Sequence, residues 1–559
     1  MNDLRRSVLW GIFVLSLIML WNQWQVFHGH PPIFGPAPAP AGAASAPASA
    51  VPSAAVPSAA TSAAATPPGG QVVAPVAEAP HERIEVSTDV LKLEFDTQGG
   101  SIIKTEFLKF PTQGQPGQPF VLLDTSAERM YQAQSGLIGG PFPTHKTVMT
   151  FSGQRTLEEG KNELTLRFES PEQGGVRLNK IYTLKRGSYV IDVRHEVVNA
   201  SGQPVSPQLY MQLVRDGSKP PDTSSFYSTF TGPAFYSDAH KFQKVEFSDI
   251  DKGKAEFAPS APDGWAAMVQ HYFASAWLLP EGQNRDNFAR KLDGNLYAAG
   301  MITTLSPVAP GATASVQSRL FIGPQVEKAL ADIAPGLDLV KDYGRTKIFA
   351  KPLYWLLDKL HGVLGNWGWA IVALVLLLKI VFYPLNAKAY SSMAKMKALN
   401  PRITDLRARY KDDPRQMQTE MMRIYREEKV NPLGGCLPMV VQMPVFIALY
   451  WVLLSSVEMR GAPWILWVHD LSMKDPFYIL PVVMTLTTLL QMALSPPPPD
   501  PMQAKMMWIM PIAFSVMFFF FPAGLVIYWV TNNILTIAQQ WIINTRMGVP
   551  PQFNLPKFF

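Results

Sequence analysis

Alternating apolar and polar residues dominate the chain between residues 83 and 324. In RIEVSTDVLKLEF (83–95) and VRLNKIYTLKRGSYVIDVRHEVV (176–198), every second side chain is apolar, and Gly, Pro, Asn and Asp separate such runs. A period of two is typical of strands with one buried face. We therefore predict an all-β sandwich over 81–335, with one helix interrupting it at Gln325–Ile333.

The pattern changes to helical spacing after residue 344. Ile348, Leu353, Leu356, Leu357 and Leu360 recur on one face of a helix over 345–364, which either lies flat in a membrane interface or packs on the β domain. Long apolar runs follow, and we predict a polytopic membrane core over 365–545. Its spans are expected at 366–385, 436–457, 477–494, 506–521 and 523–543.

The first thirty residues form a separate apolar segment. Arg5 and Arg6 precede an apolar run from Val8 to Phe27, which either is a cleaved signal peptide or anchors the chain. We favour an anchor, because about 20 residues suffice to span a bilayer and Trp21 and Trp24 suit its interface. Residues 31–80 are mostly Ala, Pro, Ser, Val and Gly, a composition typical of a disordered linker.

The charge distribution predicts the orientation. Segment 386–432 contains eleven basic and six acidic residues, so the positive-inside rule places it in the cytoplasm, with both termini, and the β domain outside. The basic residues are Lys388, Lys395, Lys397, Arg402, Arg407, Arg409, Lys411, Arg415, Arg423, Arg426 and Lys429, and the acidic ones are Asp405, Asp412, Asp413, Glu420, Glu427 and Glu428. This topology has six spans, and residues 546–559 form a cytoplasmic tail.

The basic segment itself has a helical-hairpin pattern. Met393, Met396 and Leu399 repeat at three-residue spacing, and Asp413 before Pro414 predicts the start of the second helix. Its charge either sets topology alone or docks acidic or RNA-bearing partners such as a ribosome, with Arg407, Arg409 and Lys411 as the docking candidates.

Lys379 is the sharpest chemical feature, because it lies inside an apolar span. A lysine at that depth costs a few kcal/mol, so it either snorkels toward the interface or faces a wet internal cavity. No acidic residue occurs in the second to sixth spans as drawn, so the lysine has no counter-ion there. Polar residues of the other spans favour the cavity; they include Gln442, Thr485, Thr487, Thr488, Gln491, Thr531, Asn532, Asn533 and Gln539.

Several motifs together resemble one family. NPLGGCLPMVVQMPVFIALYW (431–451), APWILWVHDLSMKDPFYILP (462–481) and FPAGLVIYW (521–529) are similar to the YidC/Oxa superfamily of insertases, and the preceding anchor, linker and β domain resemble its Gram-negative form. The resemblance implies a β-supersandwich outside the membrane and a hydrophilic groove that carries a positive charge. The usual arginine is replaced here by Lys379, which keeps the charge and loses bidentate hydrogen bonding.

The resemblance also implies roles for other residues. Gln442 and Trp529 are expected to line the groove, and Asn532 joins them as a polar residue of the last span. Structural roles are expected for Pro384, Gly434, Gly435, Pro444, Pro522 and Gly524.

The implied function is insertion and folding of inner-membrane proteins, alone or with the Sec translocon. The expected partners are nascent membrane proteins, the translocon, the ribosome and signal recognition pathway, and lipid, with no direct DNA binding. No enzymatic activity, cofactor or metal is implied, since there is no P-loop and only one cysteine, Cys436.

Two alternatives stay open. A small-solute transporter could use Lys379 as a counter-charge, although no internal repeat supports it. The β domain could instead bind sugars as an enzyme does. Its nearest candidate, the group Asp192, His195 and Glu196, is more simply interpreted as a solvated strand face.

Overall fold

A computed structural model describes residues 80–220, 229–410, 413–428, 437–495, 501–546, 548 and 553. The predicted anchor, nearly all of the linker, Gly434 and Gly435 therefore lie outside the described residues, as does most of the predicted tail.

Nineteen strands form the first part of the described chain. They are β1 (Arg83–Ser87), β2 (Leu91–Asp96), β3 (Ser101–Thr112), β4 (Gln115–Val121), β5 (Asp124–Thr125), β6 (Met130–Ile138), β7 (Thr150–Gly153), β8 (Glu163–Glu169), β9 (Val176–Lys185), β10 (Val190–Asn199), β11 (Gln208–Asp216), β12 (Gly232–Ser237), β13 (Lys241–Lys244), β14 (Ser260–Ala261), β15 (Trp265–Val269), β16 (Phe273–Leu278), β17 (Arg285–Lys291), β18 (Leu296–Thr304) and β19 (Thr313–Pro324).

The strands form two antiparallel sheets, which confirms the predicted all-β sandwich. One sheet has the order β1-β2-β3-β6-β11-β18-β17-β14, with β4 and β5 added beside β3 and β6, and the other has the order β13-β12-β15-β16-β19-β10-β9-β8-β7. Strand β8 (ELTLRFE) alternates between exposed and buried positions, as its sequence predicts. Alternate side chains such as Phe95, Phe168 and Trp277 fill the space between the sheets.

Short helices cover the outer face of the second sheet. Helix α3 (Glu327–Ile333) and the 3-10 turn η1 (Leu337–Val340) contribute Leu330, Leu337 and Val340 to a second core against Tyr236 and Trp265. The helix predicted at Gln325–Ile333 is therefore present, beginning two residues later. The sequence did not predict α2 (Phe247–Asp251), a five-residue helix with no buried residue.

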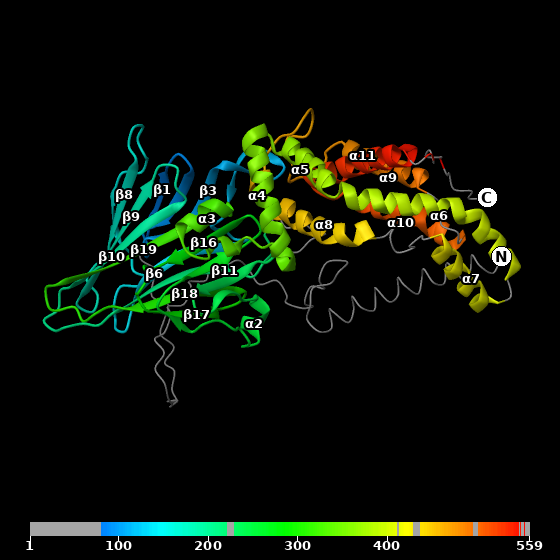
Figure 1. Ribbon diagram of the computed structural model, residues 1–559. Coiled ribbons are helices and arrows are strands. Elements are labelled where there is room, and N and C mark those ends of the chain that lie inside the picture. Colours follow the sequence, from blue (N-terminus) through cyan, green and yellow to red (C-terminus); the bar gives the residue numbers. More distant parts are fainter. Residues whose placement is uncertain are drawn as a thin grey trace, which may run out of the picture.

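The rest of the described chain is helical. Its elements are the 3-10 turn η2 (Gly344–Thr346), α4 (Lys347–Leu364), α5 (Trp367–Val381), α6 (Tyr383–Arg409), α7 (Pro414–Glu427), α8 (Leu437–Ser455), the 3-10 turn η4 (Val457–Met459), α9 (Ile479–Leu494), α10 (Pro501–Phe518) and α11 (Ala523–Arg546). Figure 1 shows α4 at the junction between the β domain and the longer helices, and α7 at the end far from the β domain.

The segment 366–385, which the sequence predicts as a span, is broken into two helices. Helix α5 ends at Val381, and the chain bends by 62° before α6 continues to Arg409. Pro384 explains the break, because its ring lacks an N–H and would clash with the carbonyl four residues earlier; here it occupies the first turn of a new helix. By length and apolar composition no single described helix suffices to cross a bilayer, whereas Trp367–Val381 and Tyr383–Ser392 together do.

Helix α4 packs against the helical bundle, and its Lys351 also pairs with Asp338 at the end of the β domain. Ala350, Leu353 and Leu357 are buried in the same core as residues of α5, α8 and α11, while Ile348, Trp355 and Val363 are exposed. One face thus binds the helical bundle, and the other presents apolar side chains outward.

Candidate functional site

A buried polar cluster joins the end of α5 to α11. Lys379 is only 5% exposed, and its ammonium donates a hydrogen bond to Thr536 Oγ1 at 2.7 Å. Gln539 Nε2 donates to the backbone oxygen of Lys379 at 3.1 Å, and Asn386 Nδ2 donates to Gln539 Oε1 at 3.2 Å. Within the described part of the chain, the ammonium of Lys379 has no charged partner, in agreement with the sequence. We call Lys379, Asn386, Thr536 and Gln539 the lysine cluster.

The helical period explains why α11 contributes most of this surface. Trp529, Asn532, Thr536 and Gln539 are spaced by three or four residues and so share one face of the helix. The hydroxyl of Thr536 donates to the Asn532 carbonyl at 2.6 Å, which leaves its oxygen to accept from Lys379. Thr536 and Asn386 were not predicted from the sequence. The four-residue step from Asn532 to Thr536 was the signal that could have found the threonine.

The other three predicted groove residues lie on α8 and α11. Gln442 Nε2 donates to Asn532 Oδ1 at 3.2 Å, so these two side chains meet between the helices. Trp529 lies three residues before Asn532 and packs edge-on against Phe446, with ring centroids 4.7 Å apart, and beside Phe518 at 5.0 Å. Lys379 and Gln442 thus meet different members of the same α11 face.

A second polar contact joins α11 to α9. Asn533 Nδ2 donates to Thr487 Oγ1 at 3.2 Å and to Thr488 Oγ1 at 2.8 Å, and Gln540 Nε2 donates to the Leu494 carbonyl at 3.2 Å. These polar groups are satisfied by one another, as groups removed from water must be.

The outer faces of the same helices are apolar. Large exposed hydrophobic side chains occur on α5, α9, α10 and α11, which is the reverse of the pattern that a water-soluble bundle requires. They include Leu376, Leu377, Ile380, Val381, Leu486, Leu490, Ile509, Met510, Phe514, Val516, Ile534 and Ile542.

The residues with expected structural roles lie at helix breaks and close approaches. Pro384 starts α6, Pro444 lies inside α8, and Pro522 directly precedes α11. Gly524 is in the first turn of α11, where a Cβ would lie 3.2 Å from the Leu471 carbonyl, a tight contact.

The basic hairpin folds as its sequence predicts. Asp413 caps α7 by accepting hydrogen bonds from the amides of Arg415 and Gln416, both at 3.1 Å. Leu399 and Ile403 of α6 form a small core with Tyr425 of α7. Arg409 is exposed at the end of α6. Arg407 is in the same helix, although its side chain is outside the description, and Lys411 lies outside the described residues.

The group Asp192, His195 and Glu196 does not converge. His195 is fully buried between the sheets, where its Nε2 lies 2.9 Å from Ser135 Oγ, and burial lowers its pKa well below the usual value. Asp192 and Glu196 point to the other face of β10, where they pair with Lys185 and Arg194. A catalytic triad of these three residues is excluded by this geometry.

Comparisons with known proteins cover almost the whole chain. Residues 83–356 match the family described as the YidC periplasmic domain, and residues 359–549 match the 60Kd inner membrane protein family. Membrane protein insertases YidC of Cupriavidus taiwanensis and Bordetella petrii are 54% and 55% identical over 555 residues, which cover 98% of this chain and of each relative. A crystal structure of an active YidC insertase with its first transmembrane domain is 20% identical, with a TM-score of 0.38, over 82% of this chain and 91% of that one.

The β domain and the helical region are therefore the two parts of an inner-membrane protein insertase, which is not an enzyme. The chain belongs to the YidC family. Its substrates as an insertase are nascent membrane proteins, and this membership replaces the solute-transporter alternative.

Proposed function

We propose that Lys379 is the charge that receives acidic segments of a client inside a polar groove. The observation that carries this proposal is the contact of the Lys379 ammonium with the side-chain hydroxyl of Thr536, without a carboxylate partner in the described region. An ammonium has three donors, and a rotatable hydroxyl is a partner that an incoming carboxylate can replace. Gln442, Asn532 and Gln539 extend the polar surface along α11 and α8.

The apolar outer faces support a multi-pass arrangement in this proposal. In this arrangement the bent pair of α5 and the first part of α6 crosses the bilayer, and so do the apolar segments 436–457, 477–494, 506–521 and 523–543 and the N-terminal anchor. Both termini are then cytoplasmic, and the hairpin 386–432 lies on the cytoplasmic side. The lysine cluster is at the hairpin end of α5, so the groove opens toward the cytoplasm.

The proposed mechanism lowers the cost of moving polar segments. An ionic group at the bilayer centre costs several kcal/mol, and a polar groove shortens the apolar path that it must cross. A membrane potential adds about 2.3 kcal/mol per charge per 100 mV for an acidic tail that moves outward. The apolar helix of the client then leaves the groove for lipid, which releases hydrophobic free energy.

Insertion of two matched clients tests this role. The clients differ only in Asp and Glu of the translocated tail, changed to Asn and Gln in the second, and protease protection in energised proteoliposomes reports insertion. We expect Lys379→Ala to slow the acidic client about tenfold, the effect of ~1.4 kcal/mol, and the neutral client much less. Lys388→Ala, which removes an exposed lysine of α6, is the control. Equal slowing of both clients would contradict the role of the charge.

We further propose that the hairpin docks the ribosome or the targeting machinery. Some basic residues of the hairpin form ion pairs within it: Arg402 pairs with Glu428 at 2.7 Å, and Arg423 pairs with Glu427 at 3.1 Å. The exposed Arg409, with Arg407 and Lys411, is offered as the docking surface. Cooperation with the Sec translocon belongs to the same proposal.

Ribosome co-sedimentation of the full-length protein tests the hairpin. Binding should weaken as salt rises, and reversal of Arg407, Arg409 and Lys411 to Glu should weaken it at low salt. The control reverses three exposed lysines of the β domain, Lys109, Lys146 and Lys161, and so changes net charge equally. Binding that is insensitive to salt and to hairpin reversal would rule out this surface.

A further inference from the structure

The segment 456–475 lies between the β domain and the start of α11. It follows α8, contains η4, and ends just before α9. We call it the brace loop. The brace loop contacts the β domain on one side and the first turn of α11 on the other. Neither set of contacts could be predicted from the sequence pattern.

Arg460 anchors the brace loop in the β domain. Its Nε and Nη2 donate to the Pro111 carbonyl at 3.2 and 3.0 Å, and the side chain is 6% exposed. The guanidinium carbon lies 4.6 Å from the ring centroid of Phe120 and 5.3 Å from that of Phe273. A planar guanidinium suits such a site because it can stack on rings while it donates in its own plane. Val457, three residues earlier, is fully buried in the β-domain core.

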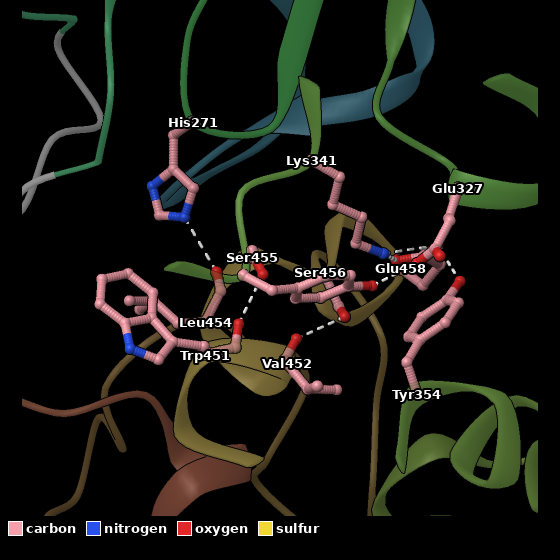
Figure 2. A network of polar contacts seen from close by, with 11 residues as sticks. His271, Glu327, Lys341, Tyr354, Trp451, Val452, Leu454, Ser455, Ser456 and Glu458 are labelled. Carbon is pink, nitrogen blue, oxygen red and sulfur yellow. Dashed lines mark hydrogen bonds and ion pairs between the residues drawn. The ribbon is translucent and has the colours of Figure 1, made fainter. Parts of the chain in front are cut away.

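Glu458 forms a second anchor, which Figure 2 shows. It pairs with Lys341 at 3.4 Å and accepts a hydrogen bond from the Tyr354 hydroxyl at 2.6 Å, so it joins the loop to the end of the β domain and to α4. The Lys341 ammonium also lies 3.9 Å from the ring centroid of Tyr354. Nearby, His271 Nε2 lies 2.8 Å from the Leu454 carbonyl, at the end of α8 where helix carbonyls lack internal partners.

The other side of the brace loop holds the first turn of α11. The amide of Ala523 donates to the Met473 carbonyl at 2.6 Å, and the amide of Gly524 donates to the Leu471 carbonyl at 2.9 Å. The first amides of a helix have no partner within the helix, and these two are supplied by the loop. Asp475 also fixes the start of α9 by accepting from the Leu480 amide at 2.7 Å.

We propose that the β domain positions α11 through the brace loop, and that Arg460 is the positioning residue on which this depends. The sequence of contacts runs from the Pro111 carbonyl and the rings of Phe120 and Phe273 to Arg460, and then through Leu471 and Met473 to α11. Thr536 lies thirteen residues along the same helix, which corresponds to about 20 Å at 1.5 Å per residue. The β domain is thereby a fixed support for the helix that lines the groove.

Hydrogen exchange of the full-length protein in lipid nanodiscs tests the coupling. Arg460→Ala should speed exchange of the Ala523 and Gly524 amides about tenfold or more, because the loop that accepts from them loses its anchor. The control is Lys474→Ala, which also removes a charge from the brace loop. The ammonium of Lys474 contacts the Tyr478 hydroxyl at 3.3 Å. Exchange at both amides should be unchanged in the control, and exchange in α7 should be unchanged in both variants.

Two further variants keep the proposal falsifiable if Arg460→Ala fails to fold. Arg460→Lys keeps the charge but not the two-point donation, so it should speed exchange at the same amides by a smaller factor. In a Cys436→Ser background, Gln113→Cys and Ser472→Cys joined by a short bis-maleimide should restore slow exchange to Arg460→Lys, since these side chains already meet at 3.3 Å. Unchanged exchange at Ala523 and Gly524 in both Arg460 variants, or no restoration by the crosslink, would overturn the proposal.

Discussion

The β domain and the helical region each contain a buried lysine, and the two lysines differ in the groups that accept their hydrogen bonds. Lys180 in β9 is fully buried, and its Nζ donates to the backbone carbonyls of Gly99 at 2.6 Å and Ser135 at 2.7 Å. Lys379 in α5 donates instead to the side-chain hydroxyl of Thr536. Backbone carbonyls in a sheet and its turns are fixed, so they cannot make way for another partner of the lysine. A side-chain hydroxyl can rotate away from the lysine and leave its place to another acceptor. The comparison supports our proposal that Lys379, unlike Lys180, can exchange its protein partner for a carboxylate of a client.

The side chains that surround the two lysines also differ between the two regions. Lys180 lies among the aromatic and aliphatic side chains between two sheets, opposite His195 in the register of β9 and β10. Lys379 lies among amide and hydroxyl side chains, on helices that present apolar residues outward. A polar interior with an apolar exterior fits a protein whose substrates pass from polar surroundings into lipid.

Reversal of the exchangeable charge should give the largest effect. Lys379→Glu should impair insertion of an acidic-tailed client more than Lys379→Ala does, by more than about tenfold relative to the original protein, because it adds repulsion to the loss of attraction. Lys379→Arg should retain insertion, since long-range attraction needs the charge rather than its shape. Protease protection measures each rate. Normal insertion of acidic clients by Lys379→Glu would show that the charge at position 379 does not act on the client.

Loss of the hydroxyl partner should have a smaller effect. Thr536→Val removes the group that accepts from Lys379 while nearly preserving its volume, and Thr536→Ser keeps that group. We expect Val to slow insertion of acidic clients about two- to fivefold, in line with ~0.5–1 kcal/mol for one hydrogen bond, and Ser to be close to the original. The same assay measures this. Similar rates for Val and Ser would show that the threonine does not hold the ammonium.

The fixed lysine should affect stability rather than insertion. Burial lowers the pKa of Lys180 to about 7, from 10.5. Between these values the unfolded chain binds a proton that the folded domain does not, so stability rises with pH, by up to about 1.4 kcal/mol per pH unit, and the penalty is complete below pH 7.

The measurement is hydrogen exchange of β9 and β10 in the full-length protein from pH 7 to pH 9, corrected for the intrinsic pH dependence of exchange. Lys180→Met should flatten the pH dependence of the opening free energy and leave the insertion ratio of acidic to neutral clients unchanged. A variant with the same pH slope as the original protein would show that Lys180 stays charged.

The sequence predicted local features well and contacts between helices poorly. Alternation in strands such as β8 predicted the sandwich, and Asp413 before Pro414 predicted the start of α7, because each signal lies within a few residues of its effect. Lys379 was recognised because a charge in an apolar run is conspicuous. Pro384 was noticed, but the break at Phe382 that it causes was not predicted.

Contacts between distant segments left no local signal. The partner of Lys379, Thr536, is 157 residues away, and the choice of facing surfaces on α5 and α11 depends on packing. Arg460 reads as an ordinary loop charge, since its partner Pro111 is 349 residues away. The sequence therefore identified residues of the proposed groove, but not the contacts that we propose to support it.

The proposed mechanism requires that the Lys379 amine contacts carboxylates of a client during insertion. A carbodiimide joins an amine to a carboxylate only where they touch, and a lysine at this position, unlike an arginine, can form that amide. Stalled insertion of an acidic-tailed client into proteoliposomes, followed by carbodiimide treatment and mass spectrometry, should yield a peptide in which Lys379 is joined to an acidic residue of the tail. Lys379→Arg should abolish that product while insertion continues. A client joined only to exposed lysines such as Lys388, with the same yield in Lys379→Arg, would contradict the claim.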